Sequence, residues 1–358
     1  MADKVIVGMS GGVDSSITAF LLKQQGFDVE GVSFTLYEAR MRKAFSKAPC
    51  CSIEAMNDAA KTADSLGIKH KIIDLREEFI EKVIEPFISS YYNGTTPNPC
   101  ILCNKFIKFP YLLNEAEQKN AKFIATGHYA NIAAVDKTCF LMKGIDAKKD
   151  QSYVLYALDS KTLSRLTLPL GKMTKNDVRE TAKKLDIPAA KRKESQEICF
   201  IDESGYPCFI DGMIESKEGP LIDAESGKIL GHHKGIHLFT VGQRKRLGIA
   251  TGKPCYVIKI DSSENAVYIG TKGMAMRKQI IANEVNWLID KNHDFKATVK
   301  IRSMMQDEPA IVEIIDKFKV RIIFDQSQWA PAPGQSAVFY QGNVVVGGGI
   351  IVSSVLQD

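Results

Sequence analysis

One short loop, SGGVDSS at positions 10–16, has the residue types needed to hold an anion. Gly11 and Gly12 allow the backbone to turn tightly and to approach a phosphate closely, and the serine hydroxyls add hydrogen-bond donors. Asp14 does not fit a bare phosphate cradle, so it predicts a Mg²⁺ ion that bridges to the phosphates. The chain lacks both the GxxxxGK[ST] loop and the GxGxxG fingerprint, which disfavours a kinase-type or dinucleotide-binding protein.

A second stretch, TPNPCILCNKFIKF at positions 96–109, carries cysteines that could act as nucleophiles. Pro97 and Pro99 favour an extended approach, and Cys103 stands immediately before a helical pattern that starts near Asn104. Because a helix N-terminus lowers the pKa of a thiol, Cys103 is expected to be reactive. The chain has eight cysteines, and in a cytosolic protein these indicate catalysis, metal binding or core packing rather than a disulfide framework.

Strands and helices alternate around these two stretches. Strand-like runs are expected at 4–9, 29–37, 70–75 and 122–128, and helical patterns at 14–25, 52–66 and 104–119. Such alternation predicts an α/β fold with a doubly wound parallel sheet, in which ligands bind beyond the carboxyl ends of the strands. The loop at 10–16 follows the first of these strands, which is where such a ligand would bind.

The pattern of predicted secondary structure changes after about residue 200. Turn-rich sequence is followed from residue 235 by short strand-like runs, beginning with GIHLFTVG at 235–242, and the turns DSSEN and QGN suit hairpins. We expect an ATP-binding catalytic domain at 1–200, a connecting domain at 201–280 and a small C-terminal β-barrel at 281–358.

Composition sets broad limits on the class of protein. The 358 residues are 45% apolar and 25% charged, with a net charge of +5. No apolar run reaches the roughly 18 residues needed to span a bilayer, and no secretory signal is recognisable, so a cytoplasmic protein without membrane attachment is expected, by default a monomer. Between Lys161 and Lys193, ten Lys and Arg stand against three Asp and Glu, an excess of seven positive charges that could follow nucleic-acid phosphates.

The loop SGGVDS resembles the PP-loop of the ATP pyrophosphatases. Over nearly the whole chain the sequence resembles the bacterial tRNA-uridine 2-sulfurtransferases, through GMSGGVDS, CCS, NPxxLCNxxIKF, ATGHYA, KDQSY, SQEICFI and FTVGQR, in that order. The resemblance implies ATP-dependent thiolation of the wobble uridine of tRNA at its 2-oxygen, with lysine, glutamate and glutamine tRNAs as acceptors and an upstream protein as persulfide donor.

The resemblance also implies roles for individual residues. ATP would be bound by the PP-loop and two further residues: Gly8, Met9, Ser10, Gly11, Gly12, Val13, Asp14, Ser15, Phe34 and Gly127. Cys199 would carry the persulfide and Cys103 would be its partner nucleophile. The flipped target base and the tRNA would be contacted by Asn98, Pro99, Cys100, Lys149, Asp150, Gln151, Arg302 and Ser303.

Two positions depart from the family pattern. Ser303 stands where the family has Tyr and offers no ring for stacking, and Cys100 stands where it usually has Asp. Cys100 either is a spare thiol beside the persulfide relay, or joins Cys103 and Cys199 in holding a four-iron, four-sulfur cluster with one open iron. Two more distant alternatives are a small-molecule PP-loop ligase and a non-catalytic tRNA-binding or iron–sulfur carrier protein.

Overall fold

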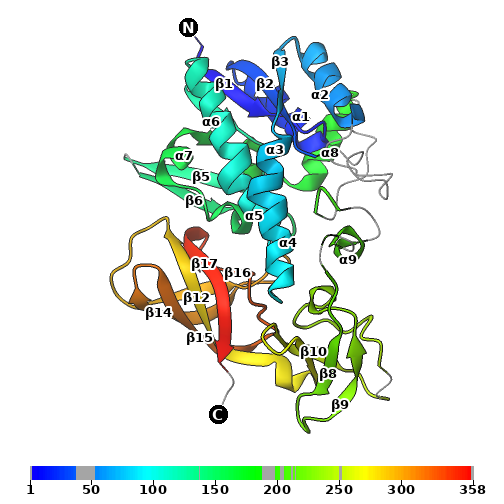
Figure 1. Cartoon of the computed structure of the whole chain (residues 1–358). Coiled ribbons are helices and arrows are strands. Elements are labelled where there is room, and N and C mark those ends of the chain that lie inside the picture. Colours follow the sequence, from blue (N-terminus) through cyan, green and yellow to red (C-terminus); the bar gives the residue numbers. More distant parts are fainter. Residues whose placement is uncertain are drawn as a thin grey trace. The chain divides into compact units, whose positions relative to one another are not determined.

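The computed structural model describes residues 2–37, 53–136, 138–187, 198–201, 205–210, 213, 215–249 and 252–355. The chain divides into two compact units (Figure 1). The first comprises Met1–Val83, Pro99–Glu203 and Asn343–Val345, and the second Ile84–Asn98, Ser204–Gly342 and Val346–Asp358. Among the described residues, no helix is both long enough and apolar enough to cross a membrane.

A five-stranded parallel sheet forms the centre of the first unit. Its strands are β1 (Lys4–Gly8), β2 (Asp28–Thr35), β3 (Lys69–Asp74), β4 (Phe123–Ala125) and β7 (Leu166–Thr167), in the order β3-β2-β1-β4-β7. The predicted doubly wound sheet is therefore confirmed, although β4 is shorter than the expected strand at 122–128.

Helices cover both faces of this sheet. Val5 and Val7 of β1 pack with Ala19 of α1 (Val13–Gln24) and Ala59 of α2 (Ile53–Leu66). On the other face, Gly8 lies against Leu112 of α6 (Phe109–Gln118), which Figure 1 shows in front of the sheet. Successive residues of β1 thus serve opposite layers, as the two-residue period of a strand requires.

The helix that carries Cys100 and Cys103 begins earlier than the sequence predicts. A run of α5 (Pro99–Cys103), one π-helical turn at Asn104–Lys108 and α6 replaces the expected helix at 104–119. Proline is favoured in the first turn of a helix because its missing N–H would have no partner there, so Pro99 starts the helix rather than extending the approach. Cys103 therefore lies inside the run, and the prediction that it precedes a helix N-terminus is wrong.

The remaining elements before residue 200 are short, and one of them, α4 (Glu85–Tyr92), belongs to the second unit. The others are α3 (Arg76–Phe79), a π-helical turn (Ile80–Ile84), the antiparallel hairpin β5 (Ala130–Val135) and β6 (Thr138–Lys143), a 3-10 turn (Ser152–Leu155), α7 (Ser160–Arg165), a second 3-10 turn (Pro169–Lys172) and α8 (Lys175–Lys184). Helix α8 begins with a capping box, in which the Thr174 and Asp177 side chains bond each other's backbone N–H.

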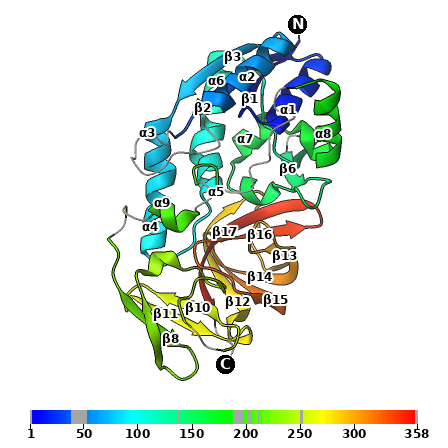
Figure 2. The ribbon, with the colours of Figure 1, turned by 90° about the vertical axis from the view of Figure 1, so that its right-hand side faces the viewer.

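The second unit contains a four-stranded sheet, seen from another side in Figure 2. Its strands are β8 (Gly219–Asp223), β9 (Ile229–His233), β10 (Tyr256–Asp261) and β11 (Ala266–Gly270), and α9 (Tyr206–Ile210) precedes them. The DSSEN hairpin joins β10 to β11, as expected. The strand expected at 235–242 is wrong: Ile236–Leu238 form a 3-10 turn, because Ile236 and His237 are both buried and do not alternate as strand residues would.

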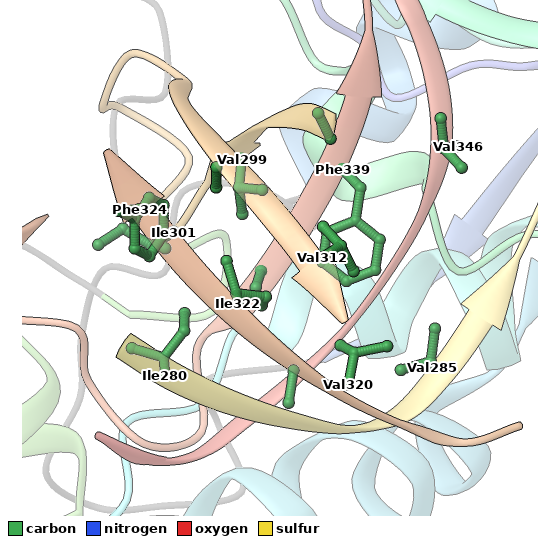
Figure 3. Packing of buried hydrophobic residues seen from close by; sticks show 14 of the residues in the cluster. Ile280, Val285, Val299, Ile301, Val312, Val320, Ile322, Phe324, Phe339 and Val346 are labelled. Carbon is green, nitrogen blue, oxygen red and sulfur yellow. The ribbon is translucent and has the colours of Figure 1, made fainter. Parts of the chain in front are cut away.

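Six antiparallel strands close into the C-terminal barrel. They are β12 (Met276–Trp287), β13 (Phe295–Lys300), β14 (Glu308–Asp316), β15 (Lys319–Trp329), β16 (Ser336–Gln341) and β17 (Val344–Val355), with a 3-10 turn (Gly273–Ala275) before the first. Strand β12 pairs with both β15 and β17, which closes the barrel. Figure 3 shows its apolar interior, where Val299, Val312, Ile322 and Phe339 come from four different strands. The predicted barrel is confirmed.

Candidate functional site

The glycine loop lies between β1 and α1, as the sequence predicts. Gly11 has φ +72°, and a Cβ there would lie 2.1 Å from the backbone oxygen of Ala55, so only glycine fits. The Ser15 hydroxyl donates to the Gly12 oxygen at 3.0 Å and accepts from the Ser10 backbone N–H at 3.1 Å. Ser15 therefore links two backbone groups of the loop, those of Ser10 and Gly12.

Helix α1 presents its N-terminus at this loop. Its N-cap residue, Gly12, has no side chain to bond the amides of the first turn. Those amides and the positive end of the helix dipole form the environment that binds phosphate in other proteins. The loop thus has the geometry of an anion site, and the Ser10 side chain beside it is exposed.

Asp14 is paired with a lysine that the sequence analysis did not identify. Lys175 at the start of α8 places Nζ 2.7 Å from both carboxylate oxygens of Asp14, and the Tyr129 hydroxyl donates to Oδ1 at 2.7 Å. The Lys175 ammonium also lies 5.6 Å from the centre of the Tyr129 ring. Lys175 thus supplies positive charge at Asp14, and the Mg²⁺ predicted at this carboxylate stays a prediction. The signal in the sequence was the capping box that starts α8, which fixes where Lys175 lies.

A second loop packs directly against Asp14. A Cβ on Gly127 would lie 2.8 Å from the carbonyl carbon of Asp14 and 3.0 Å from the Ser15 nitrogen, so this close approach requires glycine. Gln151 holds the loop in place. Its side-chain Oε1 accepts from the backbone N–H of Tyr129 at 2.9 Å, and its backbone N–H donates to the backbone oxygen of Tyr129 at 2.8 Å. Gly127, predicted from the family resemblance, is therefore at the glycine loop.

Asp150 and Lys149, the two residues that precede Gln151, have different surroundings. Asp150 turns inward, where its Oδ1 accepts from the N–H groups of Gly144 at 3.0 Å and Ser152 at 3.1 Å. Lys149 is half-buried. Asp150 and Gln151 thus shape the loop around Tyr129, and their predicted contact with tRNA remains a prediction.

His128 is a buried neutral side chain. Its Nδ1 lies 2.7 Å from the Thr126 hydroxyl, and its ring stacks on Phe109 with centroids 5.9 Å apart. Burial, and secondarily the charge of Lys108, lowers the pKa of His128 to about 3. A neutral imidazole held in this way supports the end of β4 next to Gly127.

Met9 and Phe34 lie at the carboxyl ends of β1 and β2. The Met9 N–H donates to the Val32 oxygen at 2.7 Å, and the Ser33 hydroxyl donates to the Met9 oxygen at 2.6 Å. Phe34 is buried edge-on against Tyr111, with ring centroids 6.5 Å apart. Both are at the sheet edge where ligands bind in this class of fold.

Three cysteines of the predicted chemistry differ in exposure. Cys100 is exposed, Cys103 is buried and Cys199 is half-buried. Next to Cys103, the Asn104 amide donates to the Val154 oxygen at 3.0 Å. Across the described ranges, no three His, Cys, Asp or Glu side chains are grouped so as to hold a metal ion, and the cluster on these cysteines stays a prediction. Cys50 and Cys51 lie outside the described residues.

The other predicted contacts are in the second unit. Asn98 ends the segment before α5. Arg302 donates from Nη2 to the backbone oxygens of Val241 at 2.8 Å and Ala330 at 2.9 Å. Ser303 next to it is half-buried. Arg302 thus ties two turns together, a structural role that the sequence did not suggest.

Comparisons with known proteins agree with this arrangement. Residues 3–203 match the family model described as the tRNA methyl transferase HUP domain, residues 208–271 the tRNA methyl transferase PRC-barrel domain and residues 277–351 the aminomethyltransferase beta-barrel domain. The chain is 44% identical over 354 residues to the tRNA-specific 2-thiouridylase MnmA of Halothermothrix orenii, covering 98% of this chain and 99% of that protein. It is 45% identical over 360 residues to tRNA-specific 2-thiouridylase MnmA 1 of Caldanaerobacter subterraneus, covering 99% of each.

Proposed function

Since this chain belongs to the tRNA-specific 2-thiouridylase MnmA family, we propose an assignment of its residues to the steps of tRNA 2-thiouridylation. The reaction consumes ATP and replaces the 2-oxygen of the wobble uridine by sulfur. The observation that best supports the assignment is the glycine loop at the start of α1, with Asp14 held by Lys175 and Tyr129.

The first step takes place at the glycine loop. The backbone amides at the start of α1 bind the ATP phosphates, and Gly11, Gly12 and Gly127 leave room for that approach. Uridine O2 attacks the α-phosphorus, the bond to the β-phosphate oxygen breaks, and pyrophosphate leaves with that electron pair. Lys175 stabilises negative charge on the departing group and holds Asp14 in place. Mg²⁺ bound with ATP would help to neutralise the phosphates.

The second step transfers sulfur. Cys199 carries a persulfide delivered by a donor protein, and its terminal sulfur attacks C2 of the activated uracil so that AMP leaves with the C2–O bond electrons. The Cys103 thiolate then attacks Cys199, forming the Cys103–Cys199 disulfide and leaving the electron pair on the uracil sulfur. A reductant must restore both thiols after each turnover. Alternatively, the Cys103 attack comes first and frees sulfide, which then adds to C2.

The tRNA contacts complete the assignment. Asn98, Pro99 and Cys100 line the flipped base, Lys149 contacts the tRNA phosphates, and Asp150 and Gln151 shape that loop. Arg302 and Ser303 lie at a further tRNA contact on the second unit. Lysine, glutamate and glutamine tRNAs are the proposed acceptors.

A cysteine panel tests this assignment on the full-length protein. Cys103→Ser and Cys199→Ser are expected to abolish 2-thiouridine formation and to retain ATP binding, and only Cys199 in wild type is expected to gain one sulfur from a persulfide donor, seen by peptide mass. Cys208→Ser is the control, because Cys208 is an exposed cysteine with no role in the proposed reaction. Normal thiolation by Cys103→Ser would refute the assignment.

A further inference from the structure

The segment that precedes α5 is hydrogen-bonded to the C-terminal barrel. Residues 95–98 have no regular secondary structure and lead directly into Pro99. The Thr96 N–H donates to the Pro333 oxygen at 2.7 Å. The Gln335 side-chain amide then donates from Nε2 to the Thr96 oxygen at 3.0 Å and to the Pro97 oxygen at 3.3 Å. One turn of the barrel thus bonds three backbone groups of two consecutive residues.

The same turn also contacts this segment without side chains. Gly334 has φ +91°, and a Cβ on it would lie 2.9 Å from both the nitrogen and the oxygen of Thr96. Real Cβ contacts are not this short, so any larger residue must push Thr96 away or move the turn. The turn itself is fixed, because Gly334 donates to the Ile351 oxygen and Ile351 donates to the Gln335 oxygen, both at 2.8 Å.

A second contact holds the Thr96 side chain. Its hydroxyl lies 3.5 Å from that of Thr240, which lies 3.4 Å from the Tyr206 hydroxyl. Tyr206 is in turn stacked on Tyr91 of α4, with ring centroids 4.5 Å apart. Thr96 is therefore held from two sides by residues of the second unit.

The prolines in this part of the chain increase the importance of the contacts with the barrel. Pro97 and Pro99 have no N–H and a fixed φ, so neither can donate a backbone hydrogen bond. The Pro97 oxygen is bonded to Gln335, and Asn98 is the next residue in the chain. Gln335 and the Gly334 turn therefore set the position of the Asn98 backbone.

We propose that Gln335 is a positioning residue for the target base, acting through Thr96 and Pro97 on Asn98. This inference rests on the proposed assignment of Asn98, Pro99 and Cys100 to the flipped uridine. The barrel then contributes to the chemical step as well as to tRNA contact, because it holds the segment that carries Asn98, one of the residues against which the base must be placed. Because a displacement of about 1 Å can slow a reaction by about 100-fold, loss of this support should act on kcat.

Gln335→Met tests the role of the amide, since methionine has the same length and no donor. We expect kcat for 2-thiouridine formation to fall by about 10- to 100-fold, with KM for ATP and for tRNA within about twofold of wild type. The matched control is Gln341→Met, because Gln341 also donates its amide to a backbone oxygen of the barrel, that of Lys296 at 3.2 Å. This control should retain wild-type kcat.

A glycine pair tests the same contact independently. Gly334→Ala should reproduce the loss of kcat, because its Cβ collides with Thr96. Gly342→Ala should not: Gly342 also has a positive φ, +60°, but nothing lies within 4 Å of its Cβ. Backbone strain arises in both variants, so the comparison isolates the collision, and the thermal unfolding midpoint of each variant records the strain.

The outcomes separate this proposal from the assignment beneath it. Unchanged kcat in folded Gln335→Met and Gly334→Ala would overturn the positioning role, as would a loss confined to KM for tRNA. If Cys103→Ser still thiolates tRNA, the assignment of the site is wrong and this inference falls with it. Loss of kcat in both test variants, with Cys103→Ser inactive and both controls normal, would support both.

Discussion

Lys175 and Asp14 are 161 positions apart in the sequence, yet Nζ of the lysine lies 2.7 Å from each carboxylate oxygen of the aspartate. The glycine loop itself contains no lysine, and this one comes from the first turn of α8. The pair therefore joins the loop that follows β1 to a helix that begins after the last strand of the same sheet. Loop shape and positive charge are supplied by different parts of the chain.

Lys175→Met should weaken both ATP binding and folding. The substitution leaves the Asp14 carboxylate without its cationic partner in a largely buried position. We therefore expect a loss of about 3 kcal/mol in the free energy of unfolding. This is the lower end of the usual range, because the Asp14 side chain keeps 33% of its surface exposed. ATP affinity, measured by calorimetry, should fall by about 10- to 100-fold.

Lys172→Met is the control for this prediction, since Lys172 is exposed and lies three residues earlier. It should change neither quantity. Wild-type ATP affinity in Lys175→Met would show that the lysine has no part in binding the nucleotide.

Gly127→Ala should abolish activity by displacing the start of α1. Its Cβ would lie 2.8 Å from the Asp14 carbonyl carbon, so the two loops must separate. We expect ATP binding to be lost and unfolding to occur at a lower temperature. Gly273→Ala is the control because nothing lies within 4 Å of its Cβ, and full ATP binding by Gly127→Ala would contradict the close packing of the two loops.

His128 should make stability depend on pH. Its pKa is lowered from 6.5 to about 3 on folding, so the unfolded chain binds more protons between these values. Stability is therefore lost as pH falls through this window, by up to about 1.4 kcal/mol per pH unit and by about 2 kcal/mol at pH 5. Denaturant unfolding between pH 7.5 and 5 measures this slope.

His128→Gln is expected to flatten that slope while lowering stability overall. The exposed His293 provides the control, and His293→Gln should keep the wild-type slope. Parallel pH profiles for His128→Gln and wild type would mean that His128 titrates normally in the folded protein.

Iron and acid-labile sulfide distinguish the two sulfur-transfer chemistries. In protein purified without oxygen, we expect thiolation activity that does not depend on iron content, and we expect Cys100→Ala to retain activity. The reason is that Cys100 is exposed whereas Cys103 is buried, so the two side chains have different surroundings. Stoichiometric cluster that tracks activity and is lost in Cys100→Ala would reverse this conclusion.

The parallel sheet, the glycine loop and the barrel could be predicted because their signals are local. The apolar run of β1, Gly11 at a tight turn and the hairpin turns of the second half each depend on a few neighbouring residues. The start of the cysteine helix was missed for the opposite reason. Pro99 reads equally well as the end of an extended segment or as the first helical residue, and only tertiary packing decides between them.

The ion pair at Asp14 and the contact of Gln335 with Thr96 were not predictable. Both join residues far apart in the chain, and no residue type at either end indicates its partner. Lys175 lies in a basic segment that equally suggested an RNA-binding surface. Arg302 shows the same limit, since its two backbone acceptors come from turns distant in sequence.

The order of synthesis gives the Gln335 contact a further consequence. Thr96 leaves the ribosome 239 residues before Gln335, and the turn that holds it is itself bonded to Ile351 on the last strand. Domains generally fold as they emerge, N-terminal first. A nascent or truncated chain can therefore form the parallel sheet and its glycine loop before the segment ahead of Cys103 is fixed. The ability to bind nucleotide would arise early in translation, and the ability to thiolate only after Ile351 has emerged.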